Sequence, residues 1–153
     1  MFLYRISEKQ FAGDLTGDGA RIAGGRWNPK GVPMIYTAES VALAALEVLV
    51  RISTGKHYYR TIFQTSDTAS TETVAVEDLP SDWQIPYPNR HLIEFGKTWI
   101  LERRSLLLKV PSAVVNGDGW NFLINPLHAD FLTVKITDIS PFIYDSRLVN
   151  NNG

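Results

Sequence analysis

Apolar residues cluster or alternate with polar ones in several short segments of the chain, a pattern that predicts β-strands. The expected strands cover residues 1–6, 33–37, 58–64, 73–76, 106–110, 132–137 and 142–148. Residues 120–131 combine strand-like and turn-like parts, and the proline-rich residues 79–88 predict an irregular crossing.

Two longer segments predict helices because their apolar residues recur at helical spacing. The first is capped by Thr37 or Ser40 and continues to Gly55, and the second follows Asn89 and covers residues 91–104. Residues 7–25 predict a glycine-rich loop, either alone or after a short helix near residues 8–11. Since strands and helices mix without regular alternation, the sequence predicts an α+β fold with a mixed sheet core and flanking helices.

The length of the chain, 153 residues, suits one domain with a sizeable core. We expect the domain to cover residues 1–149 and residues 150–153 to form a disordered tail. The chain has no cysteine, which excludes disulfides and thiolate metal sites and fits a reducing compartment.

The charge and hydropathy of the chain limit its partners. Fifteen basic and 16 acidic residues give a net charge of −1, which argues against strong binding of nucleic acid. No apolar stretch approaches the length of about 20 residues that crosses a membrane, and no signal peptide opens the chain. We therefore expect a cytoplasmic protein that does not contact a membrane.

Glu47 is the most unusual residue of the first predicted helix. It is the one polar residue between Val41 and Val50, so a helix that is buried on all sides would also bury its carboxylate. An unpaired buried carboxylate is costly and requires a partner or a ligand. The structural alternative is a pair with Arg51, which at this spacing contributes about 0.2–0.5 kcal/mol on an exposed helix face. Both interpretations stay open at the level of the sequence.

Three other residues are candidates for chemistry, each with a structural alternative. Arg26 follows paired glycines, where a guanidinium suits a phosphate or carboxylate but is more often a solvated loop residue. Tyr36 ends a strand and either stacks on a planar ring or packs in the core. Ser112 follows a strand end without a GxSxG elbow or a nearby histidine, as a turn residue or a cleft residue. The three histidines lack metal-ligand spacing, so we expect no metal site.

The order and spacing of these residues resemble the RES domain family, the toxin components of bacterial toxin–antitoxin pairs. Tyr36 lies ten residues and Glu47 lies 21 residues after Arg26 (36 − 26 and 47 − 26). The one departure is Ala129, where the family often has proline between histidine and aspartate. The matching residues are Tyr4-Arg5, Gly24-Gly25-Arg26-Trp27-Asn28, Tyr36, Glu47, Pro111-Ser112-Ala113, Asn121, Asn125-Pro126 and His128.

The resemblance implies a fold similar to that of ADP-ribosyltransferases, which bind NAD in a cleft as their substrate. The implied catalytic residues are Glu47, Arg26, Tyr36 and Ser112, and the implied NAD-binding residues are Arg5, Arg26, Trp27, Tyr36, Asn121 and His128. Glu47 would act at the reacting ribose and Ser112 would form hydrogen bonds in the same pocket. Arg26 would bind the phosphates or the nicotinamide-side ribose, and Tyr36 would pack against the nicotinamide.

The resemblance also implies a protein partner, a cognate Xre-type antitoxin with a helix-turn-helix region. Any contact with DNA would then be indirect and would belong to the antitoxin. Whether the chain forms a homodimer or a hetero-oligomer stays open.

This set of residues suits cleavage of the nicotinamide–ribose bond. Nicotinamide leaves as a neutral amide, so one fixed carboxylate near the ribosyl cation is sufficient, whereas a glycosidase normally needs two. Arg26 and Arg5 could offset the charges of the diphosphate. The ADP-ribosyl group would pass to water, phosphate or a protein, and the enzyme would be an NAD glycohydrolase, a phosphorylase or an ADP-ribosyltransferase.

Two other functions remain as alternatives. A metal-independent ribonuclease toxin could use His128, Arg26 and Tyr36 as acid, phosphate clamp and orienting group, although the near-neutral charge counts against it. A non-catalytic module could bind a nucleotide without turning it over.

Overall fold

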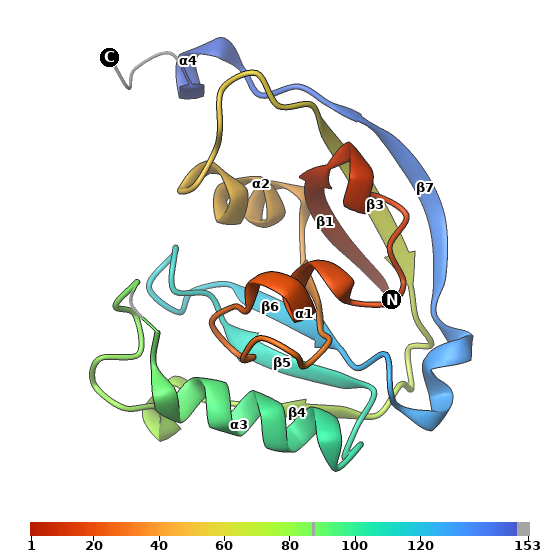
Figure 1. The fold of residues 1–153 in the computed structure, drawn as a ribbon, viewed down its shortest axis with the longest axis vertical. Coiled ribbons are helices and arrows are strands. Elements are labelled where there is room, and N and C mark those ends of the chain that lie inside the picture. The colour runs from red at the N-terminus through yellow and green to blue at the C-terminus, as the bar shows by residue number, and fades with distance from the viewer. Residues whose placement is uncertain (87, 150–153) are drawn as a thin grey trace.

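The computed structural model describes residues 1–86 and 88–149, which form one seven-stranded sheet with helices packed against it (Figure 1). The strands are β1 (Phe2–Glu8), β2 (Ile35–Ala38), β3 (Tyr58–Gln64), β4 (Thr71–Thr73), β5 (Leu107–Pro111), β6 (Trp120–Ile124) and β7 (Lys135–Phe142). Their order is β4-β5-β6-β2-β1-β3-β7, with β4 and β5 parallel and the other neighbours antiparallel. The predicted α+β fold in a single domain is confirmed, and the predicted tail at 150–153 lies outside the described residues.

The helices are short, and two of them begin at side-chain caps. They are α1 (Asp18–Ala23), α2 (Val41–Leu49), α3 (Arg90–Leu101) and α4 (Ser146–Val149), with 3₁₀ helices at Lys9–Phe11, Val76–Asp78 and Ala129–Thr133. The Ser40 hydroxyl accepts a hydrogen bond from a backbone N–H at the start of α2, and the Asn89 side chain accepts two at the start of α3. Both residues are therefore N-caps, as their sequence positions predict. None of the helices within the described ranges is long and apolar enough to cross a membrane.

The alternation of side chains along the strands divides the core between the two faces of the sheet. On one face, Leu108 and Leu123 pack with Leu92 and Trp99 of α3. On the other face, the neighbouring residues of β5 and β6 pack against β1, β2 and β3 in a second cluster. A third cluster lies under α2, where Ile6, Ala38, Leu43, Ala44 and Val48 meet. The helices α2 and α3 thus cover the same face of the sheet.

The sheet has one narrow junction. β1 pairs with β3 along its whole length, from Phe2 to Glu8, but its register with β2 consists of the single pair Tyr4–Ala38. α2 packs over this junction through the cluster that contains Ala38. The ladder β4-β5-β6-β2 is therefore joined to the ladder β1-β3-β7 at one point, and α2 spans it.

The structure corrects two expectations about α2. The helix ends at Leu49 and does not reach Gly55, because residues 50–54 contain three β-branched side chains and the chain must turn back into β3. The helix is also not buried on all sides, since Leu46 is 38% exposed and the C-cap Val50 is 69% exposed. Its apolar composition therefore does not mean that every face packs in the core.

Several other predicted boundaries are wrong. The strand expected at 73–76 is β4 at Thr71–Thr73, and the strand expected at 132–137 begins instead with a 3₁₀ helix before β7. The strand expected at 142–148 is mostly loop and α4. β4 and β7 are the edge strands of the sheet, so their polar side chains face water and weaken the apolar pattern. The helix α1 was not predicted, because Gly17 and Gly19 favour a loop. Gly17 is the N-cap of this helix and adopts a φ of 73°.

Candidate functional site

The carboxylate of Glu47 is held by two side chains from the sheet. Ser112 Oγ, just after β5, donates a hydrogen bond of 2.6 Å to Glu47 Oε1, and Asn121 Nδ2, on β6, donates another of 2.6 Å to the same oxygen. Ser112 is fully buried, and Glu47 is half-buried. Hydrogen bonds to an ionised acceptor are stronger than those between neutral groups, so this carboxylate has a fixed orientation.

The alternative pairing of Glu47 with Arg51 does not occur. Within residues 1–86 and 88–149, the ion pairs do not include Glu47, and its second oxygen, Oε2, receives no hydrogen bond. One oxygen therefore anchors the carboxylate and the other is available to a ligand.

The hydroxyl of Tyr36, on β2, is held by the loop of residues 24–28. It donates a hydrogen bond of 2.7 Å to Asn28 Oδ1 and accepts one of 3.0 Å from the backbone N–H of Trp27. Burial raises the pKa of the Tyr36 hydroxyl above its ordinary value, although the hydrogen bond from Trp27 acts in the opposite direction. The hydroxyl is therefore neutral and held in place, as a positioning group must be.

Tyr36 lies on the same face of the sheet as the partners of Glu47. It pairs with Leu123 across the β2–β6 ladder, and Asn121 is two residues before Leu123 on β6. Residues with this diagonal relation have Cα atoms about 7–8 Å apart and side chains on one face. Glu47, Ser112, Asn121 and Tyr36 thus form one cluster, which we call the Glu47 cluster.

Arg26 adjoins this cluster but is partly engaged in a structural role. Its Nη1 donates hydrogen bonds to the carbonyl oxygens of Trp83, at 2.6 Å, and Ile85, at 3.3 Å.

Trp27 is 2% exposed, and its ring packs edge-on against Phe95 at a centroid distance of 6.1 Å. Trp27 therefore contributes its backbone N–H to the cluster, while its side chain belongs to the core.

Arg5 lies on the opposite face of the sheet. Its Nη2 donates hydrogen bonds to the carbonyl oxygens of Phe11, Ala12 and Asp14, and its guanidinium lies 5.0 Å from the centre of the Phe63 ring. Burial lowers the pKa of Arg5 to about 10, with the charge of Asp14 acting in the opposite direction. The structure does not bring Arg5 together with Glu47, and its predicted contact with NAD finds no support in this position.

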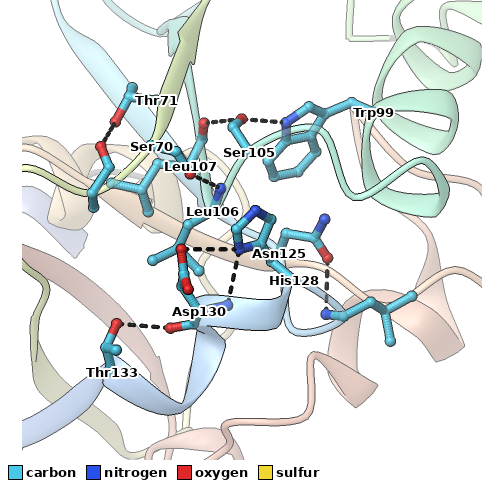
Figure 2. Close-up of polar contacts among 12 residues, drawn as sticks. Ser70, Thr71, Trp99, Ser105, Leu106, Leu107, Asn125, His128, Asp130 and Thr133 are labelled. Carbon is cyan, nitrogen blue, oxygen red and sulfur yellow. Dashed lines mark hydrogen bonds and ion pairs between the residues drawn. The ribbon is translucent and has the colours of Figure 1, made fainter.

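His128 also lies away from the Glu47 cluster. It follows the C-terminal end of β6, whereas Asn121 is near the start of that strand. Its Nδ1 accepts a hydrogen bond of 3.1 Å from the backbone N–H of Asp130 and so caps the 3₁₀ helix that follows (Figure 2). The structure therefore gives His128 a local capping role and does not place it beside Glu47.

Two features in and around the cluster were not predicted from the sequence. Asn28 is 1% exposed, and its amide donates to the carbonyl oxygens of Ala20 and Val32 while its oxygen receives the Tyr36 hydroxyl. Its place beside Arg26 in the family motif was the available signal. In addition, Asn121 Oδ1 is buried and has no hydrogen-bond partner among the described residues. Such an acceptor favours a ligand that brings a hydroxyl or an amide N–H.

The cluster offers a fixed negative charge, a free buried acceptor and a rigid aromatic ring on one face of the sheet. This combination can stabilise a positive charge that develops on a bound ligand and can orient a planar group beside it. Groups of three or more histidine, aspartate or glutamate side chains that could hold a metal ion are not found in the described part of the chain.

Comparison with known proteins gives relatives over nearly the whole chain. The "Prs ADP-ribosylating toxin" of Sphingobium sp. (strain YBL2) is 38% identical over 143 residues, which cover 90% of this chain and 88% of that protein. The protein named "Toxin Res" of Photorhabdus laumondii is 36% identical over 156 residues, which cover 97% of each chain. The protein of the same name from Yersinia enterocolitica is also 36% identical, over 97% of this chain and 99% of its own length.

A solved structure has the same fold. A chain in the crystal structure of the M. tuberculosis MbcT–MbcA toxin–antitoxin complex matches 92% of this chain and 83% of its own length, with a TM-score of 0.73 and 21% sequence identity. A family model described as "RES domain" matches residues 2–145. The resemblance that the sequence motifs predict is thereby confirmed, and the chain belongs to the RES domain family.

Proposed function

We propose that the chain is the toxin of a toxin–antitoxin pair and that it cleaves the nicotinamide–ribose bond of NAD. The observation that carries this proposal is the Glu47 carboxylate, anchored through Oε1 by Ser112 and Asn121 and free at Oε2. Support also comes from the name of one relative, an ADP-ribosylating toxin.

In the proposed reaction, the bond between the ribose and the nicotinamide nitrogen breaks, and the electron pair leaves with nicotinamide. The ribose becomes cation-like, and Glu47 Oε2 stabilises this charge without moving, because both donors already hold the other oxygen. Tyr36 packs against the nicotinamide ring, and Asn121 Oδ1 accepts a hydrogen bond from the substrate. Water, phosphate or a protein side chain then forms a bond to the same ribose carbon, and water or a neutral side chain loses a proton to the solvent in this step.

The test is nicotinamide release from NAD by the purified chain, followed by chromatography. Glu47→Gln keeps the shape and the anchored oxygen but removes the charge, so we expect release to fall about 10²- to 10³-fold, as when one electrostatic group is lost from an active site. Glu94→Gln, on the exposed side of α3, is the matched control and should release nicotinamide like the wild type. Equal release by the Glu47→Gln variant and the wild type would remove Glu47 from the mechanism.

The same assay separates the alternatives. Cleavage of RNA in the absence of NAD, without nicotinamide release, would favour a ribonuclease. Binding of NAD without turnover would favour a nucleotide-binding module.

The proposed toxin implies an antitoxin as partner and the cytoplasm as its location. The solved structure with the same fold is that of a toxin–antitoxin complex. We propose that the partner here is an Xre-type protein whose helix-turn-helix region makes any contact with DNA. Co-purification of the chain with the product of the adjacent gene tests this, and a protein that purifies alone would count against it.

A further inference from the structure

The diphosphate of a dinucleotide carries two negative charges. Arg26, the arginine that adjoins the Glu47 cluster, offsets one of them. From the sequence, Arg26 and Arg5 could offset these charges. Arg5 is on the far face of the sheet and donates to three backbone carbonyls. Arg5 is therefore not placed to bind a diphosphate at the Glu47 cluster.

Arg26 alone is a poor match for two charges. Its Nη1 is committed to the carbonyl oxygens of Trp83 and Ile85, which leaves Nε and Nη2 for a ligand. A guanidinium makes its strongest contact with an oxyanion through two parallel N–H groups, and the remaining edge of Arg26 can provide one such contact.

Arg51 is placed to provide the second contact. Its backbone N–H donates a hydrogen bond of 3.0 Å to the carbonyl oxygen of Val48, so the chain continues in a helical turn beyond α2. Arg51 is four residues after Glu47, and residues at this spacing lie on the same side of a helix. The C-cap Val50 keeps helical backbone angles, so Arg51 follows about one turn after Glu47, which binds Ser112 and Asn121.

The side chain of Arg51 is exposed and makes no hydrogen bond or ion pair within the described ranges. Its charge nevertheless acts on the cluster. The positive charges of Arg51 and Arg26 both oppose the rise in the pKa of Tyr36 that burial causes, and Arg51 also opposes the rise in the pKa of Tyr144. Both guanidinium charges therefore act on the Tyr36 hydroxyl.

We propose that Arg51 is the second cation of the site and binds the diphosphate of the dinucleotide jointly with Arg26, while Glu47 acts at the ribose. This assignment rests on the proposed function. It gives the ligand a defined direction, with the nicotinamide end at the Glu47 cluster and the diphosphate between the two arginines.

The test measures binding of ADP-ribose, which has the diphosphate but no bond to cleave, by calorimetry. Loss of a charge-assisted hydrogen bond typically weakens binding by about 10- to 100-fold, and we expect this for Arg51→Gln. Arg51→Lys keeps the charge without the planar fork and should fall between this variant and the wild type. The matched control is Arg103→Gln. Arg103 is an exposed arginine just after α3, near the start of β5. The Glu47 cluster lies at the other end of this strand, where Ser112 follows it.

Kinetics give a second readout. Arg51→Gln should raise KM for NAD about 10- to 100-fold with little change in kcat, because the diphosphate is bound equally in the ground and transition states. Turnover of nicotinamide riboside, which has no phosphate, should be the same in the variant and the wild type. If Arg51→Gln binds ADP-ribose as tightly as Arg103→Gln does, the proposal is overturned. A wild-type chain that binds ADP-ribose through Arg51 but releases no nicotinamide would instead overturn the proposed function and leave this assignment in place.

Discussion

Replacing Gly25 with alanine should destabilise the protein through the Tyr36 hydroxyl. A Cβ atom at position 25 would lie 2.6 Å from Tyr36 Oη, 2.9 Å from Asn28 Oδ1 and 3.0 Å from Tyr36 Cζ. The hydroxyl cannot move away freely, because it donates to Asn28 and accepts from the backbone N–H of Trp27. The added methyl group must therefore displace a buried, hydrogen-bonded group.

Two opposing effects set the magnitude. Overpacking a tight site typically costs about 1–3 kcal/mol, while replacing glycine by alanine at a position with permissive backbone angles gains about 0.4–1 kcal/mol from the unfolded state. We therefore expect Gly25→Ala to lower the free energy of unfolding by about 1–2 kcal/mol. Gly13→Ala is the matched control, since its Cβ would meet only Ile139 Cδ1 at 3.8 Å, and it should be neutral or slightly stabilising.

A double-mutant cycle identifies the cause. Tyr36→Phe alone should cost about 1–3 kcal/mol for each buried group that it leaves unpaired, the Trp27 N–H and Asn28 Oδ1. In the Tyr36→Phe background the closest clashing atom is gone, so Gly25→Ala should cost clearly less there than in the wild type. Urea unfolding followed by tryptophan fluorescence gives the four free energies. Additivity within about 0.3–0.5 kcal/mol would refute the proposed clash with the hydroxyl.

Three further substitutions test other parts of the fold. Asn125→Ala removes a fully buried carboxamide that holds two backbone groups, and urea unfolding should show a loss of about 1–3 kcal/mol for each group left unpaired. The hydrogen bond from Arg60 lowers the pKa of Asp138. This pair therefore stabilises the protein above the ordinary carboxyl pKa and ceases to do so as the pH falls through the lowered value. In Asp138→Asn, the free energy of unfolding should consequently fall less steeply as the pH is lowered into the acid range. Burial raises the pKa of Tyr144 to about 12, and its hydroxyl donates to the carbonyl oxygen of Ala45 at 2.6 Å. Its contribution is complete below the unfolded pKa of about 10 and is lost towards pH 12, so the difference in urea midpoint between the wild type and Tyr144→Phe should shrink as the pH rises through this range.

The sequence predicted the interior elements of the fold well. β3 lies at Tyr58–Gln64 as expected, and α3 begins at the Asn89 cap, because each of these elements has a clear apolar pattern and an evident boundary residue. The edge strands were misplaced, since pairing with a distant strand decides their position and local residues do not. α1 was missed because Gly17 and Gly19 favour a loop. β4, for example, follows the register of β5, 36 residues away at the pair Thr71–Leu107 (107 − 71).

The candidate site was predictable in part. Ser112 and Asn121 both bind Glu47, in contacts that join residues 65 and 74 positions apart in the chain, and Tyr36 lies on the same face of the sheet. Arg5 and His128 share the motif, yet each forms local hydrogen bonds away from the cluster. The motif lists the candidate residues, but the strand face and the strand end on which each one lies determine which of them are close together. Both depend on the pairing of β1, β2 and β6, which the sequence does not show.

The single Tyr4–Ala38 pair between β1 and β2 has a mechanical consequence. α2 is seated over this junction, while the hydrogen bonds of its Glu47 reach residues of β5 and β6 in the other ladder. A small tilt of the β1-β3-β7 ladder, which curves along one side of the molecule in Figure 1, would carry the helix with it and draw the acid away from both donors. A ligand that separates the two ladders would break the hydrogen bonds of Glu47 without contacting it. A ligand that holds the ladders together would keep the carboxylate in its orientation.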